Sequence, residues 1–405
     1  MKSLDDLEVA GRTVLVRADF NVPLADGPDG PDDTKVITDD GRIRAALPTI
    51  SYLRDQGAKV VLIAHLGRAK GERVEGLTLQ PVADRLSELL DADVEVADDI
   101  TGPHAKAMVA ALEPGEVVLL ENIRFDARET SKVAEERQAL AAELAALGDV
   151  YVSDGFGVVH RNQASVTDVA RLLPAAAGRL VHKEATIFGK IMAEPARPFV
   201  VILGGSKVSD KLGVIGNLIG RVDRLLIGGG MAYTFLAAQG HGVGNSLLEA
   251  DQIETVKGFI TQAQERGVEL LLPVDFVIAD AFAADAQTEI VDADSIPDGW
   301  MGLDIGPKTR ELFASRIAGA GTVVWNGPMG VFEMEPFAGG TLAVARAMAA
   351  SSALTVIGGG DSAAAVRILD VDEDAFTHIS TGGGASLEFL EGKTLPGLAV
   401  LEESA

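Results

Sequence analysis

The chain has 405 residues, a formal net charge of −25 and no cysteine; 47% of its residues are hydrophobic and 23% are charged. Such a composition is typical of a globular protein with enough apolar material for two or three cores, and it argues against extended disorder. The lack of cysteine excludes disulfides and thiolate metal sites, and the acid excess makes nucleic acid and anionic membranes poor partners because phosphates would be repelled.

The beginning of the chain, Met1-Lys2-Ser3-Leu4, lacks the apolar core of a signal peptide, and no segment reaches about 18 apolar residues in a row. We therefore expect a cytoplasmic protein without a membrane partner. The acid excess suits a salty cytoplasm as well as an ordinary acidic bacterial protein. An anionic ligand would need basic groups gathered locally against this charge.

Short β-rich runs alternate with longer Ala/Leu-rich helical patterns along the whole chain. The predicted strands cover 13–17, 59–64, 116–120, 149–153, 199–203, 224–227, 270–273, 322–325 and 353–357. The predicted helices between them cover 79–90, 134–147, 208–220 and 340–350. This alternation predicts an α/β fold with doubly wound, Rossmann-like parallel sheets and helices on both faces.

The alternation breaks at 171–198, where an Ala/Pro-rich stretch precedes a helical pattern. We therefore predict two domains, 1–180 and 181–389, joined by a hinge with an interdomain helix, and a tail, 390–405, that packs back on the first domain. The insert at 25–33 is rich in Gly, Pro and Asp and predicts an exposed loop.

Basic residues in the first half follow the predicted strands. These strand-end positions hold Arg17, Asp19, Asn21, His65, Arg68, Arg124, His160 and Arg161. Because the carboxyl ends of parallel strands share one edge of a sheet, the side chains should converge there. Guanidinium groups bind phosphate and carboxylate oxygens in a bidentate fork, so the set predicts a site for a small polyanion. The alternative is a set of ordinary surface ion pairs.

Glycine takes the place of arginine at the strand ends of the second half. The clusters lie at 204–205, 228–230, 358–360 and 382–384. Glycine lets backbone N–H groups approach an anion closely, and helices that begin just afterwards direct their positive ends toward it. Four such clusters predict phosphate binding, although a tight strand-to-helix turn alone would also need glycine.

Two lysines and one aspartate add charge to these glycine turns. Lys207 and Lys211 are four residues apart at a predicted helix start, so both can point toward a transferring phosphoryl group, or only one of them is functional. Asp361 is a candidate carboxylate for Mg²⁺ bound to nucleotide phosphates, or a simple helix cap.

Two weak motif matches do not support other nucleotide folds. Gly392-Lys393-Thr394 resembles the end of a Walker A loop, but Leu387 stands where its first glycine belongs. An NAD-dependent dehydrogenase is disfavoured because no correctly spaced Gly-x-Gly-x-x-Gly turn follows the first strand. A phosphometabolite-binding sensor on the same fold remains a non-enzymatic alternative.

Seven segments in order carry a resemblance to one family. They read RADFNVP at 17–23, HLGR at 65–68, ENIRF at 121–125, GGSKVSDK at 204–211, WNGP at 325–328, GGGDS at 358–362 and STGGGAS at 380–386. The chain resembles the phosphoglycerate kinase family nearly end to end. Ala69 and Gln163 depart from the family's usual proline and histidine, and neither change removes a charged group assigned to the chemistry.

The resemblance implies an N-terminal domain that binds 3-phosphoglycerate and a C-terminal domain that binds Mg-ADP or Mg-ATP. It implies reversible transfer of the acyl phosphate of 1,3-bisphosphoglycerate to ADP, in line and after domain closure, by a monomer. The implied substrate set is Asp19 and Asn21 at the hydroxyl and carboxyl end, His65 and Gly67 in support, Arg42 at the reacting carboxyl, and Arg68, Arg124 and Arg161 on the other phosphate.

The resemblance also implies the nucleotide and catalytic sets. Lys211 would contact the nucleotide phosphates, Glu333 the ribose, Gly302 the nucleoside pocket and Asp361 the metal. The rest of the nucleotide set is Gly205, Asn326, Gly359, Gly360 and Ser362. The implied catalytic set is Arg42, Lys207, Lys211, Gly383 and Gly384. No general base is needed to make ATP, because an ADP oxygen is the attacking group.

Overall fold

The structure is a computed structural model that describes residues 1–27 and 35–403. The chain forms two compact units: unit 1 comprises Met1–Ile187 and Thr394–Ala405, and unit 2 comprises Phe188–Lys393. The boundary falls inside one helix, α5 (Arg179–Ala193). The predicted loop at 25–33 falls largely on 28–34, outside the described residues. No helix among the described residues has the length and apolar character needed to cross a bilayer.

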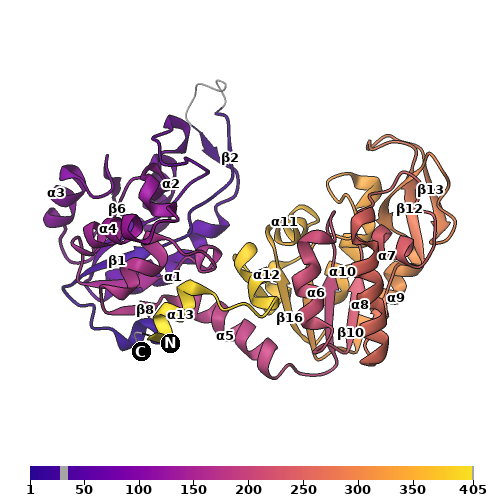
Figure 1. Ribbon diagram of the computed structural model, residues 1–405. Helices are drawn as coiled ribbons and strands as arrows, with labels where there is room; N and C mark the ends of the chain where they lie inside the picture. The colour runs from indigo at the N-terminus through magenta and orange to yellow at the C-terminus, as the bar shows by residue number, and fades with distance from the viewer. Residues whose placement is uncertain (28–34, 404–405) are drawn as a thin grey trace. The chain divides into compact units, whose positions relative to one another are not determined.

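Unit 1 contains a parallel sheet with helices packed around it (Figure 1). Its strands are β1 (Thr13–Arg17), β4 (Lys59–Ile63), β5 (Val94–Val96), β6 (Val117–Leu119), β7 (Val150–Ser153) and β8 (Ala175–Ala177), and a small antiparallel pair is formed by β2 (Leu24–Ala25) and β3 (Val36–Ile37). Its helices are α1 (Gly41–Asp55), α2 (Gln80–Leu90), α3 (Pro103–Ala111), α4 (Ala134–Ala145), the first part of α5, and α13 (Pro396–Glu403). The N-terminus and α13, the last described helix, both lie in this unit, close to each other (Figure 1).

The sheet of unit 1 has the order β5-β6-β4-β1-β7-β8, and every neighbouring pair is parallel. The chain runs from β1 to one side of the sheet and returns to the other side at β7. The loops after β1 and β7 therefore lead in opposite directions, and such a reversal point is where open α/β sheets bind ligands. The central strands are buried on both faces, which explains their unbroken apolar runs.

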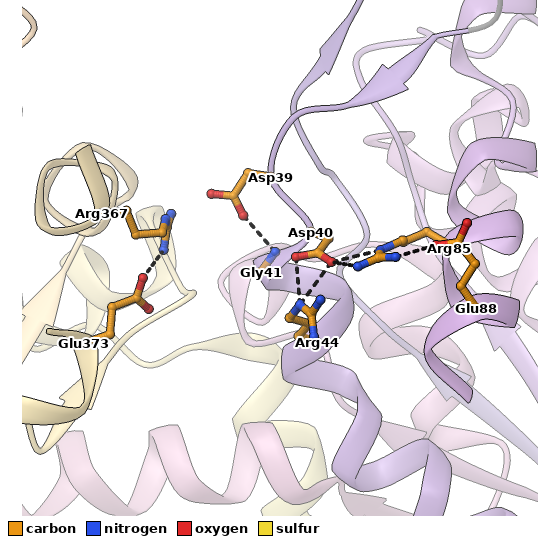
Figure 2. A network of polar contacts seen from close by, with 8 residues as sticks. All are labelled: Asp39, Asp40, Gly41, Arg44, Arg85, Glu88, Arg367 and Glu373. Atoms are coloured by element: carbon orange, nitrogen blue, oxygen red, sulfur yellow. Dashed lines mark hydrogen bonds and ion pairs between the residues drawn. The ribbon is translucent and has the colours of Figure 1, made fainter. Parts of the chain in front are cut away.

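The start of α1 is held by a polar network that Figure 2 shows in close-up. Asp40 stands directly before the helix, and its carboxylate accepts hydrogen bonds from Arg44 one turn later and from Arg85 of α2. Burial alone would raise the pKa of Asp40, but the two arginines hold it below its ordinary value. Asp39 accepts a hydrogen bond of 2.7 Å from the backbone N–H of Gly41. These contacts fix the first turn of α1, which carries Arg42.

Unit 2 repeats the parallel-sheet design. Its main strands are β9 (Phe199–Leu203), β10 (Arg224–Ile227), β11 (Glu269–Leu271), β15 (Thr322–Asn326), β16 (Leu354–Gly358) and β17 (His378–Ile379). Its helices are the rest of α5, α6 (Leu212–Leu218), α7 (Ala232–Ala238), α8 (Ile253–Glu265), α9 (Pro307–Ala318), α10 (Gly339–Ala349), α11 (Gly360–Ile368) and α12 (Gly384–Leu390). The order β11-β10-β9-β15-β16-β17 puts the reversal point between β9 and β15.

Unit 2 also contains an antiparallel sheet that the sequence did not predict. Its strands are β12 (Asp275–Ala279), β13 (Thr288–Asp292) and β14 (Met301–Ile305), in the order β13-β12-β14. The sheet buries Val277 and Leu303 against Phe337, so unit 2 has a second small core. The α/β prediction is confirmed for both units, with this sheet as an addition.

Candidate active site

The basic residues predicted to converge in unit 1 lie on neighbouring loops at the carboxyl edge of its sheet. Asp19 and Asn21 follow β1, His65 to Arg68 follow β4, Arg124 follows β6, and His160 and Arg161 follow β7. In the sheet order, β6, β4, β1 and β7 are consecutive neighbours. The parallel register therefore brings these loops to one edge, as the strand-end argument predicts.

Gly67 joins three of these loops. Its backbone N–H donates to Asn21 Oδ1 at 2.8 Å, and its carbonyl oxygen accepts from Arg124 Nη1 at 2.6 Å. Its φ of +63° lies in the left-handed region, and an added Cβ would come within 2.6 Å of Leu77, so glycine is needed here. The turn at Gly67 thus fixes the positions of Asn21 and Arg124 relative to each other.

Asp19 and Arg42 form an ion pair within this site. The Nη1 atom of Arg42 donates to Asp19 Oδ2 at 2.7 Å, and the Asn21 N–H donates to Asp19 Oδ1 at 3.2 Å. Burial alone would raise the pKa of Asp19, but the charge of Arg42, the hydrogen bond from the Asn21 N–H and the charge of Arg17 hold this pKa below its ordinary value. Asp19 therefore remains a carboxylate and binds Arg42 at the edge of the site.

Three arginines of this edge, Arg68, Arg124 and Arg161, form what we call the arginine rim. Within the described residues none of them makes an ion pair with a carboxylate, although the chain contains 60 Asp and Glu residues. Burial and the positive charges of Arg161 and Arg17 lower the pKa of Arg124 to about 10. The pKa of Arg161 is lowered by burial and by Arg17, Arg42 and Arg68, against the effect of Asp19. The arginine rim is therefore a concentration of uncompensated positive charge.

His160 lies beside the arginine rim and stays neutral. Burial and the charge of Arg161 lower the pKa of His160 to about 4, and Arg161 Nε lies 3.4 Å from its Nε2. The side-chain oxygen of Gln163, three residues later, is buried and has no hydrogen-bond partner among the described residues. The imidazole and the amide thus add polar atoms to this edge without adding charge.

In unit 2, the reversal point brings two glycine turns into backbone contact. The Gly204 N–H donates to the carbonyl of Asn326 at 3.0 Å, and Gly205 N–H donates to that of Pro328 at 2.9 Å. Gly327 has a φ of +97°, and an added Cβ would lie 2.3 Å from the backbone oxygen of Gly204. Only glycine allows the two strand ends to approach this closely. The buried Trp325 supports the turn by donating from Nε1 to the Gly327 carbonyl at 2.7 Å.

These turns surround a cavity of about 330 Å³, which we call the glycine cavity. It is lined by Gly204, Gly205, Ser206, Lys207, Asp210, Lys211, Asn326, Gly327, Pro328, Gly359, Gly360, Asp361, Ser362, Gly383 and Leu387. The lining residues come from the segments that follow β9, β15 and β16, from the turn before α12 and from α12 itself. Most of the predicted nucleotide and catalytic residues of unit 2 therefore meet at one place.

Lys211 is the buried cation of the glycine cavity. Its Nζ donates to Asn326 Oδ1, and Asn326 Nδ2 is buried without a hydrogen-bond partner among the described residues. Burial lowers the pKa of Lys211 to about 8, against the opposing effect of Asp210, Asp361 and Glu391. The ammonium group is thus mainly charged at pH 7 and poorly compensated.

Lys207 lines the same cavity but is exposed. The prediction that Lys207 and Lys211 lie at the start of an α-helix is wrong. Lys211 ends a 3₁₀ turn (Ser209–Lys211), Lys207 precedes that turn, and the α-helix begins only at Leu212. The predicted helix at 208–220 is correspondingly shorter in the structure. The two lysines approach the cavity from different backbone conformations.

Asp361 and Ser362 lie in the first turn of α11, which begins at Gly360. Asp361 is exposed, whereas Ser362 is buried and its Oγ accepts from the Gly327 N–H at 2.7 Å. Neither Gly302 nor Glu333 lines the glycine cavity. Gly302 lies in β14, where its N–H donates to Ser246 Oγ at 2.9 Å, and Glu333 is exposed in the turn after β15. Gly384, the first residue of α12, follows directly on the cavity residue Gly383.

Several residues of these sites were missed by the sequence argument. Asp210 and Pro328 line the glycine cavity and lie in the segments GGSKVSDK and WNGP, but neither was given a role, and Leu387 lines the cavity from outside those segments. In unit 1, Glu129 and Ser165 are fully buried next to Arg17, and nothing in their local sequence signals this position. Contacts between residues far apart in the sequence create these positions.

The fold and the two sites define a two-unit α/β protein with a candidate anion site in each unit. The sequence model of the phosphoglycerate kinase family matches residues 4–393. The phosphoglycerate kinase of Frankia casuarinae is 61% identical over 99% of this chain and 100% of its own length, and that of Bifidobacterium adolescentis is 60% identical over the same shares. The solved phosphoglycerate kinase of Coxiella burnetii superposes with a TM-score of 0.86 at 39% identity, over 99% of this chain and 98% of that one. The structure from Pyrococcus horikoshii gives 0.84 at 35% identity, over 100% and 99%.

The chain belongs to the phosphoglycerate kinase family. It is a kinase of glycolysis that transfers a phosphoryl group between 1,3-bisphosphoglycerate and ADP, with 3-phosphoglycerate and ATP as the other pair. The predictions of enzyme class and reaction are confirmed.

Proposed function

We propose that unit 1 holds phosphoglycerate on the arginine rim and that unit 2 holds the nucleotide phosphates in the glycine cavity. The arginine rim would bind the phosphate that is not transferred. Asn21 and Asp19 would contact the hydroxyl and carboxyl end, and Arg42 would leave Asp19 to reach the reacting carboxyl. In terms of the domains proposed from the sequence, 1–180 with the tail 390–405 packed on it would bind phosphoglycerate. The domain 181–389 would bind the nucleotide.

The observation that carries this proposal is the lack of counterions on the arginine rim. In an acidic protein, an exposed or half-buried arginine usually finds a carboxylate, as Arg12, Arg44 and Arg85 do here. Burial and the charge of Arg161 instead lower the pKa of Arg124. Burial and the charges of Arg17, Arg42 and Arg68 lower the pKa of Arg161. A bound phosphate dianion would compensate this charge through short bidentate hydrogen bonds.

The glycine cavity supports nucleotide binding through backbone groups. Gly205, Gly327 and Gly359 have a positive φ, which favours glycine, and they line the cavity without side chains. Lys211 supplies a buried charge, and the unpartnered Asn326 Nδ2 supplies a donor. Gly302 and Glu333, which lie outside the cavity, would contact the nucleoside beyond the phosphates.

The transfer step needs alignment and positive charge rather than a base. The phosphoryl oxygens spread negative charge in the transition state, and Arg42, Lys207, Lys211 and the amides of Gly383 and Gly384 would stabilise it. Each candidate site lies within one unit. The two units would therefore have to bring donor and acceptor together and exclude water during turnover.

Asp361 fits the proposed magnesium site. It is an exposed carboxylate at the margin of the glycine cavity, and the described residues contain no group of three or more acidic or histidine side chains that could hold a metal alone. Mg²⁺ typically takes one or two carboxylates and otherwise phosphate oxygens and water. When bound, the ion would neutralise charge on the nucleotide phosphates.

The decisive experiment measures ATP formation from 1,3-bisphosphoglycerate and ADP with wild type, Arg124→Ala and Lys211→Ala. The proposal expects Arg124→Ala to weaken phosphoglycerate binding alone, and Lys211→Ala to weaken nucleotide binding and turnover. Loss of both affinities in either variant would contradict separate sites. A cytoplasmic monomer without nucleic acid partners completes the proposal, and sedimentation of the purified protein tests the monomer.

A further inference from the structure

A chain of buried polar side chains runs beneath the arginine rim, from Glu129 to His65. Arg17 is 1% exposed, His65 is 2% exposed, and Ser165 and Glu129 are fully buried. Arg17 Nε lies 2.7 Å from Ser165 Oγ, and this hydroxyl lies 2.6 Å from Glu129 Oε1. At the other end, Arg17 Nη2 lies 3.3 Å from His65 Nδ1. The four residues come from four separate segments of unit 1.

The directions of the two hydrogen bonds that Arg17 makes in this chain follow from the chemistry of arginine. A guanidinium group only donates, so Ser165 Oγ accepts from Arg17 and must direct its own proton to Glu129. The other carboxylate oxygen of Glu129 accepts from the Ser165 backbone N–H at 2.9 Å. By the same rule, Nδ1 of His65 can only accept. The imidazole is therefore neutral and carries its single proton on Nε2.

The charges around His65 agree with this state. Burial and Arg17 lower the pKa of His65 well below its ordinary value, Arg124 and Arg161 act in the same direction, and Asp19 opposes them. Among the described residues Nε2 of His65 has no hydrogen-bond partner. Its N–H group is free to donate to a ligand at the carboxyl edge of the sheet.

We propose that Glu129, Ser165 and Arg17 are positioning residues that hold His65 in one neutral tautomer, so that its Nε2–H donates to an oxygen of bound phosphoglycerate. The inference rests on the proposed function, which places phosphoglycerate beside His65. Glu129 and Ser165 act through Arg17 and do not touch the substrate. A fixed tautomer presents one donor to the substrate at every pH at which the enzyme works.

The first test uses long-range ¹H–¹⁵N NMR of the full-length protein labelled at histidine. The signals of His65 are identified by their loss in His65→Gln. In the wild type, Nδ1 should lack a proton and Nε2 should carry one, without titration between about pH 5.5 and 8. A proton on Nδ1, or a titration near the ordinary histidine pKa, would overturn the inference.

The second test removes the hydroxyl that links Arg17 to Glu129. Ser165→Ala should mix the tautomers of His65 and raise the Kd for 3-phosphoglycerate about tenfold, as expected for one lost hydrogen bond to a charged ligand. Tyr151→Phe is the matched control, because Tyr151 donates to the backbone carbonyl of the same Ser165 at 2.9 Å without contacting its hydroxyl. Ser165→Thr keeps the hydroxyl and should restore the wild-type spectrum.

The outcomes separate this inference from the proposed function. A wild-type protein that binds no 3-phosphoglycerate overturns the proposed function. A protein that binds it while Ser165→Ala and Tyr151→Phe leave the His65 spectrum equally unchanged overturns the positioning role. Should Ser165→Ala fail to fold, the wild-type tautomer together with Ser165→Thr decides the question.

Discussion

The arginine rim of unit 1 and the glycine cavity of unit 2 are two different solutions to anion binding on similar sheets. Unit 1 uses long side chains, with Arg124 and Arg161 held close together at the cost of mutual repulsion. Unit 2 uses backbone turns such as that at Gly327 and, among the residues described at its cavity, one buried cation, Lys211. Side chains can grip a small compact ligand from several directions, whereas backbone amides follow an extended chain of phosphates.

The difference between the two sites predicts that some residues contribute to turnover without contributing to substrate binding. Lys207 is exposed at the glycine cavity and makes no ion pair within the described residues, so it is available to the transferring phosphoryl group. Lys207→Ala should lower kcat about 1,000-fold, equivalent to about 4 kcal/mol, with little change in KM. Lys257→Ala is the control, because Lys257 is a surface lysine paired with Glu254. Steady-state kinetics of ATP formation measure both; an unchanged kcat would remove Lys207 from the mechanism.

A second change tests whether the backbone alone shapes the site of unit 2. Gly327→Ala places a Cβ against Gly204 and forces a positive φ on alanine, so it should destabilise the protein by about 3 kcal/mol. Gly319→Ala is the matched control, because Gly319 has a negative φ and open space around its Cβ position. Urea unfolding measures both. Equal stabilities of the two variants would show that the close turn is not needed.

Binding of 3-phosphoglycerate at the arginine rim should depend on the geometry of the side chains as well as on their charge. Arg124→Ala should weaken 3-phosphoglycerate binding about 100-fold, and Arg124→Lys should recover only part of it because a lysine cannot donate in a fork. Nucleotide affinity should not change. Arg12→Ala, at an arginine already paired with Glu8, is the control. Full recovery by lysine in a titration calorimeter would mean that the rim acts as a diffuse positive field.

The sequence predicted strands best where both faces of the strand are buried, because such a strand is a nearly continuous apolar run. The ranges 13–17 and 199–203 match β1 and β9 because both strands are apolar runs buried in the middle of a parallel sheet. The strand β5 was missed because it is short and lies at the sheet edge, with Glu95 exposed. The strand β13 was missed because its side chains are largely exposed, so no apolar pattern marks it.

Residues of the sites could be predicted where local sequence sets their position, and not where contacts between distant residues set it. Strand ends converge in any parallel sheet, so the position of Arg124 and of Gly359 follows from local sequence. The link from Arg17 to Glu129 depends on a contact between Arg17 and Ser165, residues 148 apart in the chain. The helix predicted at 208–220 is shorter in the structure because a 3₁₀ turn (Ser209–Lys211) takes its beginning and the α-helix starts only at Leu212.

The smallest effect predicted is a response to pH that distinguishes the two units. The pKa of Lys211 is about 8 in the folded protein and lies below its ordinary value, so the unfolded chain holds the proton more tightly between about pH 8 and 10.5. Stability without ligand should therefore rise through this window. The affinity for ADP should fall about fivefold between pH 8 and 9, because a neutral Lys211 loses its attraction for phosphate. The pKa of Arg124 is about 10, so 3-phosphoglycerate affinity should hold over the same interval.

Calorimetric titration of each ligand at both pH values measures the contrast, with Lys211→Arg as the variant that should remove the loss for ADP. A parallel loss for both ligands would locate the titrating group outside the glycine cavity.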